Sequence, residues 1–98
     1  MPPKRGLILD PRDSVANVLE DVAAGEEVAA RSGDDTVTIR AVEPIPFGFK
    51  VALTDVASGE QVYKYGEVIG RASRPIRKGT LVHIHNLAGD RGRGDLRH

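Results

Sequence analysis

Short apolar runs recur along the chain, and turn-forming residues separate them. The first run, residues 7–9, predicts a short strand that ends at the turn sequence 10–13. Asp13 or Ser14 can cap a helix after this turn, because the next apolar residues recur at helical spacing as far as Gly25. The residues with this spacing are Val15, Val18, Leu19 and Val22.

The remainder of the chain has the pattern of short strands, which are predicted at 27–32, 36–42, 50–56, 61–65 and 81–86. A tight turn over 32–35 joins the first two. Pro44 and Pro46 exclude a central strand between them, because proline lacks the backbone donor of a ladder. No repeat is evident. We therefore predict one mostly β domain over residues 1–88 with one short N-terminal helix.

The composition is that of one small domain with a thin aliphatic core. Of 98 residues, 40% are hydrophobic and 29% charged, with no tryptophan. The formal net charge is zero, so the overall field favours neither nucleic acid nor an acidic membrane as a partner. The absence of cysteine excludes disulfides and thiolate chemistry. The apolar run at 7–9 is too short for a signal peptide or a membrane span, which predicts a cytoplasmic protein.

Residues 89–98 form a polar tail that has almost nothing to bury. Its arginines and glycines are similar to those of an RNA-binding arm, but Asp90 and Asp95 oppose the basic charge and no aromatic residue can stack on bases. A flexible end or a segment that docks on a partner is the favoured interpretation.

His83 and His85 lie two residues apart on the last predicted strand, so their rings are expected on one face. Two imidazoles about 7 Å apart can converge on one metal or one anionic substrate, with Asn86 as a nearby donor. The alternative is a solvent-facing strand whose outer positions are histidine. Because no third ligand is evident in this chain, another chain would have to complete a metal site.

Two lysines on predicted strands are candidates for a base or a positive charge. Lys50 shares a face with Ala52, opposite Phe49, Val51 and Leu53. Lys64 lies between Tyr63 and Tyr65. A desolvated lysine has a lowered pKa and can act as a general base, whereas a lysine that extends to water keeps its charge. The tyrosines are either packing residues or hydroxyl donors to a sugar acid.

Residues of these types recur in a fixed order through the second half of the chain: Gly48, Lys50, Ala52, Leu53, Gly59, Glu60, Lys64, Tyr65, Gly66, Ile69, Gly70, Gly79, Val82, His83, His85 and Asn86. This ordered set resembles the SAF-type domain, of β-clip fold, in the altronate dehydratase family. That family includes galactarate dehydratase and the small subunit of sulfolactate sulfo-lyase. Phe49 departs from the family pattern, which has a histidine at this position.

The resemblance implies the small subunit of a carbon–oxygen or carbon–sulfur lyase that is not active alone. Such an enzyme eliminates water from a sugar acid such as altronate or galactarate, or sulfite from sulfolactate, together with a large catalytic subunit. It implies base or charge roles for Lys50 and Lys64, and ligation of iron or manganese or proton donation by His83 and His85. Tyr65 and Asn86 are the implied substrate contacts.

A second class of function is a non-catalytic SAF-type binding module, because SAF-like domains also occur outside enzymes. The loss of a histidine at Phe49 favours this alternative. An enzyme made of this chain alone is least favoured, because a thin domain offers few walls for a closed pocket.

Overall fold

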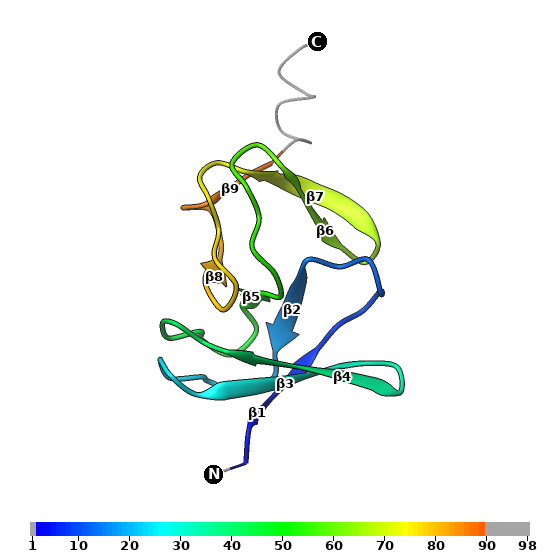
Figure 1. The fold of residues 1–98 in the computed structure, drawn as a ribbon, viewed down its shortest axis with the longest axis vertical. Helices are drawn as coiled ribbons and strands as arrows, with labels where there is room; N and C mark the ends of the chain where they lie inside the picture. The colour runs from blue at the N-terminus through cyan, green and yellow to red at the C-terminus, as the bar shows by residue number, and fades with distance from the viewer. Residues whose placement is uncertain (1, 90–98) are drawn as a thin grey trace.

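The computed structural model describes residues 2–89, which fold as β-strands joined by turns (Figure 1). The strands are β1 (Lys4–Leu7), β2 (Val15–Val18), β3 (Glu27–Ser32), β4 (Asp35–Arg40), β5 (Lys50–Ala52), β6 (Gln61–Lys64), β7 (Glu67–Ala72), β8 (Leu81–Val82) and β9 (Leu87–Ala88). They form a six-stranded sheet in the order β4-β3-β1-β2-β5-β8 and a three-stranded sheet in the order β6-β7-β9. The mostly β prediction is confirmed.

In Figure 1 the β6-β7-β9 sheet occupies the upper part of the molecule and the β3–β4 hairpin the lower part, with β2 and β5 between them. The described residues form no helix long and apolar enough to cross a membrane. The part of the predicted tail at 90–98 lies outside the described residues.

The predicted N-terminal helix is wrong, because Val15–Val18 is strand β2, which pairs antiparallel with both β1 and β5. Ala16 is 1% exposed and is as buried as its valine neighbours, whereas Leu19 of the supposed helical face is 37% exposed. A strand that is buried on both faces shows no alternation, so its sequence resembles part of a buried helix. Pairing on both edges, with the strand preference of valine, decides the conformation.

Two core clusters meet at β5. Val51 belongs to the first cluster, with Phe49 and Leu53 packed against it, while Ala52 belongs to the second. The alternation predicted for residues 49–53 is therefore confirmed, and it places Lys50 on the side of Ala52. The first cluster is completed by Ile8, Ala16, Val18, Val22, Val28, Ala30, Ile39, Ala41 and Ile45, and the second by Val15, Val56, Val62, Ala72, Ile76 and Val82.

The structure contains an internal repeat of turns. Each turn has a buried valine or isoleucine, followed three residues later by a glycine whose φ lies between +86° and +88°. Only glycine adopts such a backbone without strain. The buried residues bridge in pairs, Val22 with Ile45 and Val56 with Ile76. The corresponding glycines are Gly25, Gly48, Gly59 and Gly79.

The two bridged pairs also have equivalent hydrogen bonds beside them. Asp21 accepts a hydrogen bond from Phe47 N and Asp55 accepts one from Lys78 N, both at 2.8 Å. One unit encloses the β3–β4 hairpin and the other encloses the β6–β7 hairpin. The expectation of no repeat is therefore wrong. The repeat is also legible in the sequence, because DVAAGE at residues 21–26 and DVASGE at residues 55–60 differ at one position only.

Candidate functional site

The predicted site residues lie on three neighbouring segments of the second half. Lys50 begins β5, and Lys64 ends β6 just before Tyr65 at the hairpin tip. Lys50 pairs with Val82 of β8, so the residues after Val82 follow directly beside β5. The structure thus brings the lysines and the histidine segment to the same part of the fold.

The predicted strand at 81–86 is wrong, because β8 ends at Val82 and residues 83–86 form a turn before β9. Asn86 closes this turn. Its Oδ1 accepts a hydrogen bond from His83 N and its Nδ2 donates one to Leu81 O, both at 2.9 Å. An asparagine side chain that bonds nearby backbone replaces the ladder that a strand would need.

Because of this turn, the geometry that was predicted for two histidines on one strand face is absent. His83 is half-buried and His85 is exposed. Asn86 is 2% exposed and both atoms of its amide are bonded inside the turn, which gives it a structural role. The contact with substrate that was predicted for Asn86 stays a prediction.

The ring that lies against His83 is Phe49. The two ring centroids are 4.9 Å apart and the planes are tilted by 57°. This is the geometry of a favourable aromatic pair. Since Phe49 also packs on the first core cluster, it ties the histidine turn to β5. Position 49, and not position 85, is the ring partner of His83.

The donor set does not fit a complete metal centre. Among residues 2–89, no group of three or more histidine, cysteine, aspartate or glutamate side chains could hold a metal ion. Phe49 has no ligand atom to offer beside His83. The iron or manganese that the resemblance implies would therefore need ligands from outside the described residues.

Lys50 has an unusual electrostatic environment. Burial lowers the pKa of its ammonium, and the positive charge of Lys64 lowers it further. The ion pairs within residues 2–89 are Arg5 with Glu20 and Arg12 with Asp10, so neither lysine is neutralised by a carboxylate. The Nζ of Lys64 lies 4.8 Å from the centroid of the Tyr65 ring, a cation–π contact. Two cations within electrostatic range of each other, neither paired with a carboxylate of residues 2–89, favour binding of an anion.

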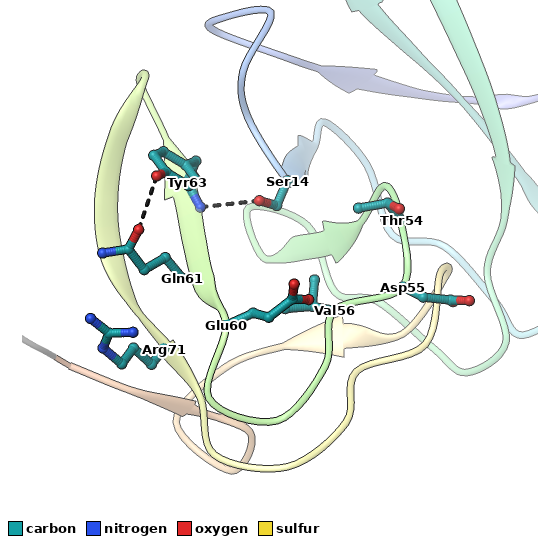
Figure 2. A pocket seen from close by; sticks show the side chains of 8 residues that line it. All are labelled: Ser14, Thr54, Asp55, Val56, Glu60, Gln61, Tyr63 and Arg71. Atoms are coloured by element: carbon teal, nitrogen blue, oxygen red, sulfur yellow. Dashed lines mark hydrogen bonds between the residues drawn. The ribbon is translucent and has the colours of Figure 1, made fainter.

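A surface hollow of about 360 Å³ lies beside Lys64 and is lined by Lys64, Tyr65, Glu67, Val68 and Ile69. A larger hollow of about 620 Å³ lies elsewhere on β6 and is lined by Ser14, Thr54, Asp55, Val56, Glu60, Gln61, Tyr63 and Arg71 (Figure 2). The larger hollow contains none of the predicted site residues. The larger hollow has Asp55 and Glu60 against Arg71, whereas Lys64 and Glu67 balance in the smaller one, so the smaller hollow is the better candidate for an anionic substrate.

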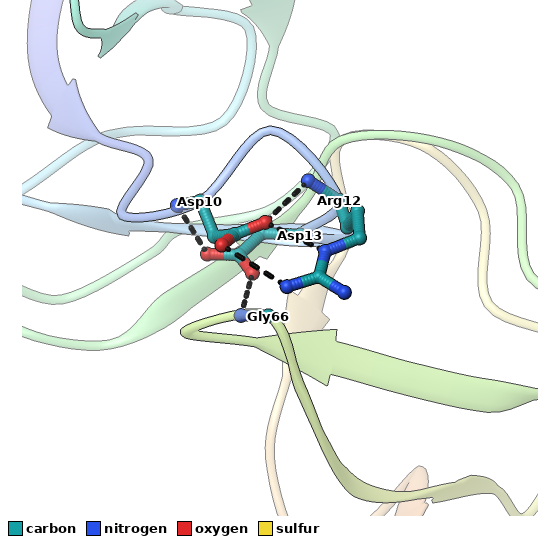
Figure 3. A network of polar contacts seen from close by, with 4 residues as sticks. All are labelled: Asp10, Arg12, Asp13 and Gly66. Carbon is teal, nitrogen blue, oxygen red and sulfur yellow. Dashed lines mark hydrogen bonds and ion pairs between the residues drawn. The ribbon is translucent and has the colours of Figure 1, made fainter.

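Two residues at the start of β2 matter for the site in a way that the sequence did not indicate. Asp13 and Ser14, predicted as helix caps, instead bond the β6–β7 hairpin: Asp13 Oδ1 accepts from Gly66 N at 2.8 Å, and Ser14 Oγ accepts from Tyr63 N at 3.1 Å (Figures 2 and 3). These partners are 53 and 49 positions away, so no local pattern could have identified them.

The chain is similar in sequence to several known lyases. The chain is 46% identical over 74 residues to altronate dehydratase of Escherichia coli strain K12, which covers 76% of this chain and 14% of that protein. It is 39% identical over 72 residues to (2R)-sulfolactate sulfo-lyase subunit alpha of Chromohalobacter salexigens, covering 71% of this chain and 77% of that subunit. Galactarate dehydratase (L-threo-forming) of E. coli is 37% identical over 70 residues, covering 71% of this chain and 12% of that protein.

The match to a family extends further than these pairwise similarities. Residues 4–90 fit the domain described as the altronate/galactarate dehydratase SAF domain, which covers every strand of the structure. The resemblance carried by the ordered glycines, lysines and histidines is thereby confirmed, and the chain belongs to the SAF-domain family of the altronate and galactarate dehydratases.

Proposed function

We propose that the chain is the small subunit of a lyase that removes a leaving group next to the carboxylate of a hydroxy acid. The substrate class is a sugar acid such as altronate or galactarate, with water as the leaving group. The observation that carries this proposal is the pair Lys50 and Lys64, two cations without a carboxylate partner among residues 2–89, one of which has a lowered pKa. Family membership supports the reaction class.

The lysines suit the two demands of this elimination. A proton next to a carboxylate must be removed by a base, and the negative charge that develops must be stabilised. Lys50, whose pKa is lowered by burial and by the charge of Lys64, takes the role of base. Lys64 holds the substrate carboxylate as a positive charge at the edge of its hollow.

The remaining candidates have supporting roles in the proposal. His83 donates a proton to the leaving hydroxyl, and the exposed Tyr65 contributes a hydroxyl to substrate binding. His85 is exposed on the same turn. We assign it to the interface with the partner, where it binds the metal or contacts the partner chain. Iron or manganese would be held mainly by the partner, so no step is assigned to a metal here.

A large catalytic subunit is the proposed partner. The hollow at Lys64 is only partly enclosed by this chain, whereas elimination chemistry benefits from exclusion of water. The relatives that span similar lengths are named as alpha subunits, and the chain covers 77% and 85% of two of them. We place the assembled enzyme in the cytoplasm and assign the SAF domain the β-clip architecture.

A second candidate function is the small subunit of a sulfolactate sulfo-lyase. The observation that favours it is similarity, because the chain is 39% identical to two alpha subunits of this enzyme. The leaving group would be sulfite and the demands on the lysines would be the same. A non-catalytic SAF-type binding module is the remaining alternative, and the ring of Phe49 beside His83 favours it.

The test begins with recovery of the tagged chain from its native host and native mass spectrometry of the complex. We expect one partner several times larger than this chain. The purified complex is then assayed on altronate, galactarate and sulfolactate, with Lys50→Met and Lys64→Gln variants. Loss of at least tenfold in kcat in both variants supports the proposal. A chain recovered alone, or full turnover in both variants, would contradict it.

A further inference from the structure

Asp13 is one of two polar residues buried within the described range, the other being Asn86. Its exposed fraction is 9%, and both of its oxygens accept backbone hydrogen bonds. Oδ1 accepts from Gly66 N at 2.8 Å and Oδ2 accepts from Asp10 N at 3.1 Å (Figure 3). The carboxylate therefore joins the loop before β2 to the tip of the β6–β7 hairpin.

Ser14 fixes the same hairpin at a second point. Its N donates to Tyr63 O at 3.0 Å, and its Oγ accepts from Tyr63 N at 3.1 Å. The hairpin is thus held at Tyr63 and at Gly66, and Lys64 lies between the two anchors. A backbone that is held on both sides leaves the lysine only its side-chain rotations.

The hairpin tip needs such anchors, because its conformation is not one that the chain adopts readily. Tyr65 has φ +59° and Gly66 has φ +72°, which places both in the left-handed region. For a residue with a side chain this costs about 1 kcal/mol. The ladder is also irregular, because the register shifts between Val62 and Tyr63. β6 is moreover an edge strand of its sheet.

The packing around Gly66 shows how closely the tip docks. A Cβ at this position would lie 2.6 Å from Arg12 Nη2 and 2.7 Å from Asp10 Oδ2. Arg12 and Asp10 are themselves joined by an ion pair of 3.1 Å (Figure 3). The loop before β2 therefore packs closely against the hairpin tip.

We propose that Asp13 is a positioning residue for the two-lysine site: its carboxylate holds the hairpin tip so that Lys64 stays beside Lys50. Asp13 acts through Lys64 and does not touch substrate, because it is buried and both oxygens are engaged. The consequence for catalysis rests on the proposed function. The placement of the lysines does not, and it can be measured on this chain alone.

The measurement is the titration of Lys50, followed by NMR on the full chain with ¹³C-labelled lysine. Since Lys64 lowers the pKa of Lys50, Lys64→Gln should raise that pKa in the otherwise unchanged protein. In an Asp13→Ala background the hairpin tip is released, so the pKa of Lys50 should already be raised. Adding Lys64→Gln should then change it no further. If Lys64→Gln raises the pKa of Lys50 by the same amount in the Asp13→Ala protein as in the natural chain, the proposal is overturned.

Two further variants keep the test decisive. If Asp13→Ala does not fold, Asp13→Asn takes its place. Asparagine has the same size but only one acceptor oxygen, so the coupling between the lysines should be weakened in part. Asp21→Asn is the matched control, because Asp21 also accepts a backbone hydrogen bond at 2.8 Å, but in the other turn unit. It should leave the coupling between the lysines unchanged. Equal loss of coupling in Asp21→Asn and Asp13→Asn would show a general destabilisation and also overturn the proposal.

The assembled enzyme separates this inference from the proposed function. If the inference and the proposed function are both right, Asp13→Asn lowers kcat of the complex and changes the dependence of kcat on pH. Asp21→Asn changes neither. If the coupling between the lysines is lost but turnover on every substrate is unchanged, Asp13 positions Lys64 and the lysines are not catalytic. The inference about Asp13 then stands and the function proposed for the lysines fails.

Discussion

The phenyl ring of Phe49 lies against the imidazole of His83, with centroids 4.9 Å apart. This contact joins the start of β5 to the turn after β8. The sequence pattern pairs His83 with His85, whereas the ring that the structure places against His83 is that of Phe49. A histidine at position 49 would therefore stand beside His83.

The first prediction follows from this pair. Phe49→His should place two imidazoles within reach of one metal ion and create affinity for Co²⁺, measured by isothermal titration calorimetry. The double variant Phe49→His with His83→Gln is the control and should bind at least tenfold more weakly. Equal affinity of the single and double variants would show that the two positions do not form a shared site.

The second prediction concerns the asparagine that closes the histidine turn. Asn86→Ala removes two hydrogen bonds to backbone groups and leaves them without partners in a buried place, which should cost about 2–4 kcal/mol of unfolding free energy. Asn17→Ala is a matched control, because Asn17 donates one hydrogen bond to Gly48 O and is half-exposed. Its expected cost is about 1 kcal/mol. Urea unfolding measures both, and similar costs would contradict the structural role of Asn86.

The third prediction compares two glycines with left-handed backbones. Gly33 has φ +63° and open space around it, so Gly33→Ala should cost about 1 kcal/mol of unfolding free energy through its backbone alone. Gly66→Ala must also displace the side-chain ends of Asp10 and Arg12 and should cost about 2 kcal/mol. Urea unfolding of both variants checks the difference. Equal costs would mean that the hairpin tip does not dock as tightly as the structure shows.

The fourth prediction is a pH dependence of stability. The pKa of Lys50 is lower in the folded chain than its ordinary value of 10.5, so between the folded value and 10.5 the unfolded chain binds more protons. Stability from this group therefore rises with pH across that window and is lowest below the folded pKa. Lys50→Met removes the penalty, so the variant should be more stable than the natural chain at pH 7.

The advantage of Lys50→Met should then shrink as the pH approaches 10.5. Thermal unfolding followed by circular dichroism between pH 7 and pH 10.5 measures this trend. Lys78→Met is the control for replacing an exposed lysine by methionine. A constant difference for Lys50→Met over the same range would argue against a desolvated Lys50.

Backbone preferences and the strand alternation could be predicted from the sequence alone. The turns at glycines and prolines, the hairpin that joins Ser32 to Asp35, and the two-sided pattern around Lys50 all depend on residues close in the chain. The family was also recognisable, because its ordered glycines, lysines and histidines survive in sequence whatever their contacts. These features need no knowledge of which distant segment packs where.

The tertiary structure alone decided everything that depends on a distant partner. Val15–Val18 became a strand because β1 and β5 flank it on both edges, and no local spacing reveals that. The same holds for the bond between Asp13 and Gly66, which is 53 positions long, and for the ring contact of Phe49 with His83. The sequence shows only which kinds of group a polar or aromatic side chain is able to bind. Which group it binds is set by the packing of the two sheets.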